Sequence, residues 1–357
     1  MNITLINEIV TFVAAIAALI IIHELGHFVA SKLFNVEVEE FGLGFPPRLA
    51  TLFTAGGTKF TLNLIPLGGF VRPKGENDPS VEGGLAAASP WVRLAVLLAG
   101  PISNLLVGVI LFAIIFSRIG MPVTSQVKVI EVAPNSPAAQ AGLQPGDMLL
   151  KINSQPVESM QDLQNGIYAN LDKSTNLTYK RDGQVEQVTL TPRSNPPQGE
   201  GAIGIVMGNP TQPVGLLQAI PMGAVTVYDN IKQLFAFPVQ LMRGSISPQE
   251  GRLVGFKGMF DIYQQVSQSE PTPTIPTWVD VLAFFATITV SLGVLNLLPI
   301  PALDGGRILF TLPEIVIGRR IPPQYENMIN LVSFALLLML LLYINLQDFI
   351  NPITLPK

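Results

Sequence analysis

The two histidines of this 357-residue chain lie four positions apart, in the pentapeptide His23-Glu24-Leu25-Gly26-His27. An α-helix completes one turn every 3.6 residues, so both imidazoles project from one helix face and can bind a single Zn²⁺ ion. Glu24 lies between them and can take a proton from a water molecule on that ion. The spacing therefore predicts hydrolytic zinc chemistry of the kind that metalloproteases use.

The helix that carries this motif is predicted to span a membrane. An almost uninterrupted apolar run from Ile9 to Ile22 leads into the motif, and residues 9–31 are long enough to cross the hydrocarbon core at ~1.5 Å per residue. The alternative is a cleaved signal peptide, which would carry positive charge before its apolar segment and a small-residue cleavage site after it. Residues 1–8 contain no Lys or Arg, and no such site precedes the histidines.

Two histidines are too few for a catalytic zinc site, which needs three protein ligands and an open position for water. The sequence has no further histidine and no cysteine, so the third ligand must be a carboxylate that reaches membrane depth. Asp304 is the candidate, because Pro299 and Pro301 break a helix just before it. Zn²⁺ would compensate its charge there. The alternative is that Asp304 only caps the break at the membrane interface.

The composition is that of an α-helical membrane protein. Apolar residues make up 48% of the chain and charged residues 13%, against about a quarter charged in soluble domains. Four apolar segments are each about long enough to cross a bilayer: residues 9–31, 94–117, 281–300 and 328–346. The net charge of −4 and the lack of a basic cluster argue against binding to nucleic acid.

The basic residues of the short loops predict how the chain is oriented. The loop between the first two spans contains Lys32, Arg48, Lys59, Arg72, Lys74 and Arg93, and the loop between the last two contains Arg307, Arg319 and Arg320. Basic loops remain in the cytoplasm. Both termini and the long middle region are then expected outside the cytoplasm, and the membrane is expected to be a cell inner membrane.

A β-hairpin at about residues 57–71 is expected on the cytoplasmic side of the first membrane core part, residues 1–120. Polar and apolar residues alternate from Lys59 to Leu64, and glycines and Pro66 bound the alternation. The edge of such a hairpin could hold an extended peptide by strand addition. The alternative is a structural hairpin that only plugs the cytoplasmic face.

Residues 125–195 resemble a PDZ domain in the circularly permuted order of bacterial proteases. A strand at Lys128–Val132 precedes a capped helix start at Ser136-Pro137-Ala138, and the turn Pro145-Gly146-Asp147 leads into a second strand. The resemblance implies an α+β domain, inserted between the second and third spans and extracytoplasmic, that binds a peptide or a substrate segment.

Residues 196–277 are predicted to form a linker and interfacial amphipathic helices. Apolar residues from Leu217 to Leu234 recur at intervals of three and four, with charges only at Asp229 and Lys232. Such a helix can lie in the membrane interface, or it can pack on the PDZ-like domain. The second membrane core part then follows at residues 278–357.

Three blocks of the sequence together resemble the signature of site-2 proteases, in their RseP-like branch. The blocks are His23–His27, the Gly100–Asn104 segment that begins Gly-Pro, and Asn296–Gly305. The resemblance implies that His23, His27 and Asp304 bind zinc and that Glu24 is the general base. The family often has a histidine where this chain has Arg307, and a further asparagine at Ser291.

The signature asparagines of this family correspond to Asn104 and Asn296. As neutral donors beside a metal ion they could steady an extended substrate or a developing oxyanion. Asparagine in a membrane helix can instead join neighbouring helices.

The family resemblance implies an intramembrane zinc metalloendopeptidase of regulated intramembrane proteolysis. Its expected substrates are single-span membrane proteins, such as an anti-sigma factor or a remnant signal peptide, cleaved within the bilayer. The alternative is a catalytically inactive, membrane-anchored PDZ scaffold that binds peptides. Glu24 favours the enzyme, because a scaffold does not need a carboxylate between two metal ligands.

Overall fold

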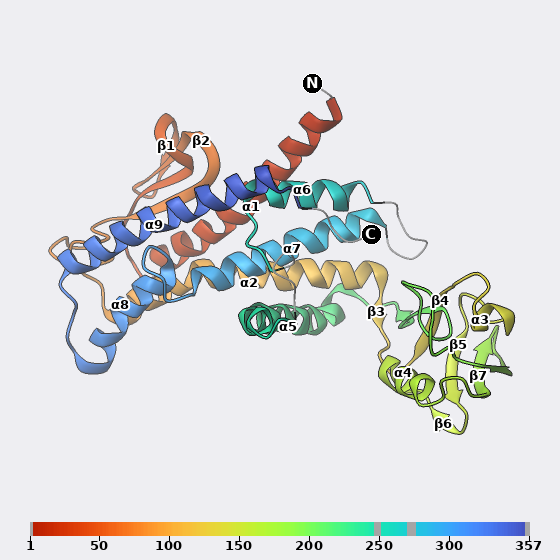
Figure 1. Cartoon of the computed structure of the whole chain (residues 1–357). Coiled ribbons are helices and arrows are strands. Elements are labelled where there is room, and N and C mark those ends of the chain that lie inside the picture. Colours follow the sequence, from red (N-terminus) through yellow and green to blue (C-terminus); the bar gives the residue numbers. More distant parts are fainter. Residues whose placement is uncertain (1–2, 246–250, 270–275, 354–357) are drawn as a thin grey trace. The chain divides into compact units, whose positions relative to one another are not determined.

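The computed structural model describes residues 3–245, 251–269 and 276–353, in two compact units (Figure 1). One unit comprises the chain up to Ile115 and from Leu216 onward, and the other comprises Phe116–Gly215. The predicted linker of residues 196–277 contributes to both units, and its residues 246–250 and 270–275 lie outside the described ranges.

The prediction of four helices able to cross a membrane is confirmed by length and composition. They are α1 (Ile3–Leu33), α2 (Pro90–Ile119), α7 (Thr277–Asn296) and α9 (Pro323–Ile350). The third begins and ends four residues earlier than the predicted segment 281–300. Its helix stops at Asn296 because Pro299 and Pro301 cannot continue helical hydrogen bonding.

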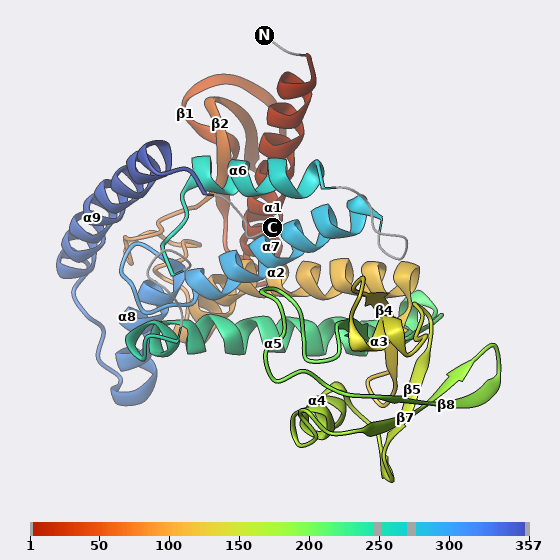
Figure 2. The same cartoon turned by 45° about the vertical axis from the view of Figure 1, so that its right-hand side comes forward.

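Within the first unit, α7 contacts α1 and the two helices α5 (Leu216–Met242) and α6 (Phe256–Ser267). Figure 2 shows α6 crossing near α1 and α7. An aromatic cluster joins these three elements, with Phe12 packed against Tyr263 and Phe285. Both α5 and α6 lie in the range where the sequence predicts amphipathic helices, and their place at a membrane interface stays a prediction.

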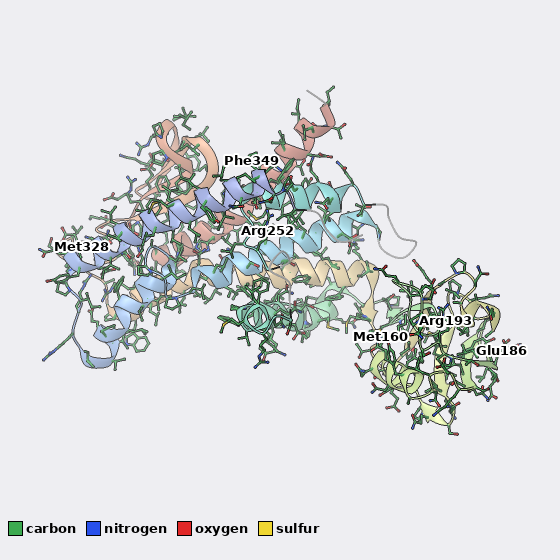
Figure 3. The ribbon with its side chains drawn as sticks, viewed as in Figure 1. Met160, Glu186, Arg193, Arg252, Met328 and Phe349 are labelled. Atoms are coloured by element: carbon green, nitrogen blue, oxygen red, sulfur yellow. The ribbon has the colours of Figure 1, made fainter. Side chains whose placement is uncertain are left out.

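Helix α9 has mostly exposed apolar side chains, and its buried residue is Asp348. The Asp348 carboxylate accepts hydrogen bonds from the Arg252 guanidinium and from the backbone N–H groups of Gly255 and Gly258, at the start of α6. Figure 3 shows Arg252 close to Phe349 at this end of α9. A carboxylate at a helix N-terminus satisfies backbone donors that have no partner within the helix. This contact therefore fastens α9 to α6.

The hairpin is larger than the predicted one at 57–71. Its strands are β1 (Val38–Ala55) and β2 (Thr58–Pro73), and both strands bend. Residues around Phe41 pair with Phe60 on one side and with Val71 on the other, so two parts of β2 flank the same part of β1. The second half of β1 is exposed along its length. It therefore shows no alternation of buried and exposed positions from which a strand could be predicted.

Glu40 of β1 is a buried carboxylate at the centre of a polar network in the hairpin. It accepts a hydrogen bond from Thr61 Oγ1 at 2.7 Å and forms ion pairs with Arg48 and Arg72. Burial by itself would raise the pKa of Glu40, but the Thr61 and Arg48 hydrogen bonds and the two positive charges outweigh it and hold the pKa below its ordinary value.

The second unit contains the PDZ-like sheet. Its strand order is β8 (Gln184–Leu190), β7 (Thr175–Arg181), β5 (Met148–Ile152), β4 (Val127–Val132) and β9 (Ile205–Gly208), with β6 (Gln155–Pro156) paired to β5. Short strands β3 (Met121–Pro122) and β10 (Thr211–Gln212) pair with each other. Strand β9 comes from residues beyond the predicted range 125–195, and its backbone pairs with β4.

Two helices, α3 (Pro137–Gln140) and α4 (Met160–Tyr168), accompany the sheet. The Ser136 hydroxyl caps α3 by accepting from the Ala139 N–H, as the Ser-Pro-Ala sequence predicts. Asp147, almost fully buried in the predicted turn, accepts two hydrogen bonds from the Arg181 guanidinium at 2.7 Å each. The turn is thereby tied to the sheet through β7.

Candidate metal centre

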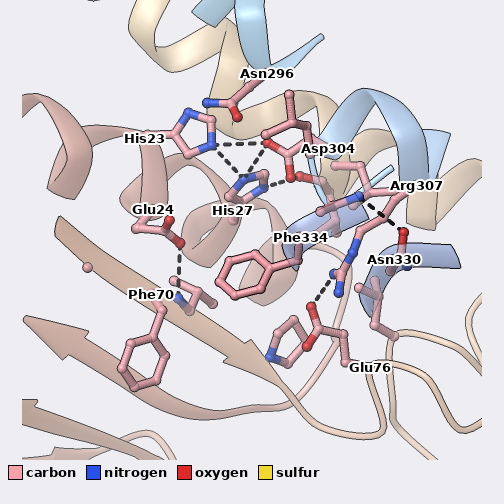
Figure 4. A pocket seen from close by; sticks show the side chains of 18 of the residues that line it. His23, Glu24, His27, Phe70, Glu76, Asn296, Asp304, Arg307, Asn330 and Phe334 are labelled. Atoms are coloured by element: carbon pink, nitrogen blue, oxygen red, sulfur yellow. Dashed lines mark hydrogen bonds and ion pairs between the residues drawn. The ribbon is translucent and has the colours of Figure 1, made fainter. Parts of the chain in front are cut away.

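The two histidines of α1 point to one place beside the start of helix α8 (Asp304–Ile317). The Nε2 atoms of His23 and His27 lie 3.2 Å apart. Asp304 Oδ2 lies 3.0 Å from His23 Nε2 and 3.3 Å from His27 Nε2. Figure 4 shows the three side chains meeting in a single cluster. Segments about 280 positions apart in the chain are thus brought together at atoms able to bind one ion.

The chain between α7 and α8 is shaped so that Asp304 reaches the histidines. Ala302 has a positive φ of 75°, and Asp304 is the first residue of α8. A Cβ on Gly305 would lie 2.2 Å from the Leu298 carbonyl oxygen, and one on Gly306 would lie 2.4 Å from that of Ile300. The two glycines therefore let α8 begin directly against the turn, with the carboxylate facing α1.

His27 is oriented by the backbone of α2. Its Nδ1 lies 2.8 Å from the carbonyl oxygen of Val96. Because a carbonyl oxygen can only accept, the proton of this imidazole is on Nδ1, and the Nε2 lone pair is free to bind a metal ion.

Asn104 of α2 contacts the other histidine. Its Nδ2 lies 3.3 Å from His23 Nδ1. The residue is fully buried, and its Oδ1 has no hydrogen-bond partner among the residues that the structure describes.

Gly100 of α2 makes room for the imidazoles. A Cβ at this position would lie 2.3 Å from His27 Nε2 and 2.8 Å from His23 Nε2. On the same helix pair, a Cβ on Gly26 would lie 2.4 Å from the Ala99 carbonyl oxygen. The two glycines allow α1 and α2 to approach so closely that the α2 backbone borders the cluster.

Glu24 lies beside the cluster and is held by the hairpin. Its Oε2 accepts a hydrogen bond from the backbone N–H of Val71 at 3.0 Å (Figure 4). Val71 belongs to the part of β2 that pairs with β1 on one side only. The other edge of this strand therefore faces Glu24.

A cavity of about 670 Å³ opens onto the cluster, and His23, Glu24, His27 and Asp304 line it. Asn296 also lines this cavity, whereas the buried Asn104 is not among its lining residues. The structure therefore separates the two asparagines that the sequence predicts to act alike.

Arg307 and Glu76, which form an ion pair, lie on the cavity wall as well. The sequence marks Arg307 as a basic residue of a short loop and as a departure from the family pattern, and it does not mark Glu76. The only sequence signal for this ion pair is that its two residues have opposite charges, and they are far apart in the chain.

The donors of the cluster suit zinc. Two imidazole nitrogens and one carboxylate oxygen leave a fourth tetrahedral position open, which is the ligand set of catalytic zinc sites. The carbonyl oxygen of Val96 supplies the kind of outer hydrogen bond that orients a zinc-binding histidine.

Comparison with known proteins identifies the family. A family model described as peptidase family M50 matches residues 11–340. The chain belongs to peptidase family M50. A proposed zinc metalloprotease of Clostridium perfringens is 34% identical over 343 residues, covering 95% of this chain and 97% of the relative. The M50 chain is also 27% identical to the zinc metalloprotease RasP of Geobacillus kaustophilus, over 96% of this chain and 98% of that protein.

A further relative of this M50 peptidase is the regulator of sigma-W protease RasP of Bacillus subtilis, 24% identical over 96% of the chain and 98% of the relative. The predicted resemblance to site-2 proteases is confirmed, and the chain is a zinc metalloprotease of the site-2 type with zinc as its cofactor.

The PDZ domain of an SdrC-like protein from Listeria monocytogenes is similar to 23% of the chain. It matches over 87% of its own length, with 25% identity and a TM-score of 0.21. A score this low adds no argument to the strand order described above.

Proposed function

We propose that this M50 peptidase cleaves single-span membrane proteins within the bilayer, with His23, His27 and Asp304 as its zinc ligands and Glu24 as its general base. This proposal rests on one observation. The three ligand atoms lie together beside α1, which is an apolar helix long enough to cross a membrane. A peptidase whose ligand helix is itself a membrane span performs hydrolysis at membrane depth.

Zinc, when bound, supplies an activated water molecule and polarises the scissile carbonyl. Glu24 then accepts a proton from the water and delivers it to the leaving amine. Its position on the cavity wall, between the two histidines in sequence, suits this role. The hydrogen bond from Val71 keeps the carboxylate in place before substrate binds.

The substrate is proposed to bind as an extended strand along the edge of β2 near Val71. A helical peptide bond is enclosed by its own hydrogen bonds, so the substrate must unwind before hydrolysis. An exposed strand edge offers the unwound segment new backbone partners. Because the Val71 N–H is bonded to Glu24, a substrate carbonyl that binds there would release the carboxylate toward the water. Asn296 on the cavity wall is the proposed donor to substrate or oxyanion.

The proposed location is a bacterial inner membrane, with the termini and the PDZ-like domain outside and the cavity open to the cytoplasm. The basic residues of the two short loops support this orientation.

The proposed substrates are anti-sigma factors or remnant signal peptides already trimmed on the outer side. The PDZ-like domain would bind a segment of the substrate or exclude substrates whose outer part is still large. The name of the Bacillus subtilis relative, a regulator of sigma-W protease, supports the first substrate class.

The test combines zinc analysis with cleavage of labelled transmembrane peptides by detergent-purified protein. Asp304→Ala should lose both zinc and activity, whereas Glu24→Gln should keep zinc and lose cleavage by roughly 10²-fold or more. Asp229→Ala, which removes an exposed carboxylate of α5, is the matched control and should retain both.

Full zinc occupancy in Asp304→Ala would rule out the third ligand. Cleavage at the wild-type rate by Glu24→Gln would rule out the base. Zinc binding by the wild-type protein with no cleavage of any peptide would favour the scaffold alternative.

A further inference from the structure

We infer that Asn104 is a positioning residue of the metal centre and does not contact substrate. Its side-chain oxygen accepts a hydrogen bond from His23 Nδ1–H and thereby selects the imidazole tautomer whose Nε2 binds zinc. This inference rests on the proposed role of His23 as a ligand. It differs from the substrate-binding role expected from the sequence.

Burial and position separate Asn104 from the substrate path. Its side chain has no exposed surface, and the cavity that exposes Asn296 does not reach it. Its polar neighbour is instead His23 Nδ1, at 3.3 Å. The Asn104 amide can therefore act on a substrate only through the imidazole.

The two orientations of the amide correspond to two states of His23. With the NH₂ group toward the imidazole, Nδ1 accepts a hydrogen bond and the ring proton is on Nε2, directed at Asp304 Oδ2 at 3.0 Å. In that arrangement the proton on His23 Nε2 stands where a metal ion would have to bind. A half-turn of the amide places Oδ1 against Nδ1, moves the ring proton to Nδ1 and frees Nε2.

Zinc binding itself selects the second orientation. A neutral imidazole that gives its Nε2 lone pair to a metal ion has its proton on Nδ1, so Nδ1 is then a donor. Within the Asn104 amide only Oδ1, which has no partner among the described residues, can accept that proton. The half-turn therefore pairs Oδ1 with the His23 Nδ1–H.

Helix α2 serves both histidines in the same way. Val96, Gly100 and Asn104 recur every four residues and therefore lie along one face of the helix. Val96 offers its carbonyl oxygen to His27 Nδ1, Gly100 leaves space for the Nε2 atoms, and Asn104 faces His23 Nδ1. The Gly-Pro-x-x-Asn block is thus explained as the outer support of the zinc ligands.

The experiment measures zinc affinity of the full-length purified chain by chelator competition. Asn104→Leu removes the acceptor at similar volume and should weaken zinc binding by about 10–100-fold. Asn104→Asp restores an acceptor and should bind zinc within a few-fold of wild type. Asn296→Leu is the matched control on the cavity wall, and it should bind zinc like wild type while cleaving substrate more slowly.

A second readout is independent of activity. Because the chain has two histidines, ¹⁵N-histidine labelling yields signals from His23 and His27 alone. Zinc-loaded wild type and Asn104→Asp should show both rings protonated at Nδ1, with the Nδ1–H of His23 hydrogen-bonded. In Asn104→Leu this hydrogen-bond shift should be lost for His23 and kept for His27.

The outcomes separate this inference from the metal assignment. Unchanged zinc affinity and an unchanged His23 signal in Asn104→Leu would overturn the positioning role and leave the metal centre intact. Weak zinc binding by Asn104→Asp, with the chain folded as judged by its thermal transition, would also overturn it. Full zinc occupancy in His23→Ala would instead contradict the metal assignment itself.

Discussion

Replacing Gly100 by alanine tests whether close contact between α1 and α2 creates the metal centre. The added Cβ would lie 2.3 Å from His27 Nε2 and 2.8 Å from His23 Nε2, about 1 Å inside ordinary van der Waals contact for the nearer atom. Metal–ligand distances tolerate errors of only roughly 0.2 Å. Because the methyl group has no rotamer that avoids the imidazoles, the histidines must move several times farther than zinc coordination allows.

We expect Gly100→Ala to retain less than about a tenth of the wild-type zinc after dialysis, since a disturbed ligand shell costs at least 10–100-fold in affinity. Elemental analysis of detergent-purified protein measures this directly. The matched control is Gly108→Ala, two turns further along the same helix face, where the new Cβ would lie 2.5 Å from a Val290 methyl group instead of a metal ligand. It introduces similar crowding between helices and should keep its zinc. Equal zinc contents in wild type and Gly100→Ala would show that close contact between α1 and α2 at Gly100 is not needed for zinc binding.

Three further changes probe the supports of the fold. The pKa of Glu40 is lowered in the folded protein, so its stabilising effect is complete above its unfolded pKa and is lost as the pH falls through the folded value. Limited proteolysis of the hairpin should therefore accelerate below about pH 4.5, and Glu40→Gln should be cleaved faster at pH 7 with a flatter acid dependence. Asp147→Ala removes the carboxylate partner of the Arg181 guanidinium, which keeps its hydrogen bond to the Gly142 carbonyl oxygen. It should destabilise the PDZ-like unit by about 2 kcal/mol, seen as faster hydrogen exchange in β5 and β7, whereas exchange in α1 should be unchanged. Asp348→Ala removes the cap of α6 and should speed exchange at the start of α6 by about tenfold or more, because hydrogen bonds to a charged group contribute about 1.5–3 kcal/mol. Protection equal to wild type would show that this carboxylate does not fasten α9.

The meeting of His23, His27 and Asp304 at one place could be predicted from the sequence, because the argument needed only local spacing and a count of the possible ligand types. The spacing of His23 and His27 fixes their common face on any helix. With no cysteine and no further histidine in the chain, Asp304 followed from coordination number. Four apolar segments of suitable length likewise predicted the four candidate spans, because whether a segment is long and apolar enough to cross a bilayer depends on that segment alone.

The rest of the site depends on backbone groups and on long-range packing. Neither determines which residue type stands at a position, so neither can be predicted from the sequence. The Val96 carbonyl that orients His27 and the Val71 N–H that holds Glu24 belong to residues that any apolar side chain could replace. The hairpin was predicted too short because the exposed half of β1 lacks an alternating pattern. Strand β9 joins the PDZ-like sheet from beyond the predicted range because pairing with β4, and not local periodicity, defines it.

The family signature predicts one role for both asparagines, and the structure shows that their surroundings differ. Asn104 and Asn296 are the same residue type, both in helices long and apolar enough to cross a membrane and both near the candidate metal centre. Burial separates them, since one is enclosed against His23 and the other lines the cavity. Solvent access, which arises from the packing of the elements around the cavity, decides which asparagine can meet a substrate.

Zinc K-edge X-ray absorption of the purified, substrate-free protein shows whether one ion is bound by His23, His27 and Asp304. We expect about one zinc per chain, with two imidazole nitrogens and light oxygen ligands at roughly 2.0–2.1 Å and no sulfur. In Asp304→Ala the zinc signal should fall with the protein concentration held constant. A zinc ion that shows fewer than two imidazoles, or that persists at full occupancy without Asp304, would contradict this ligand set.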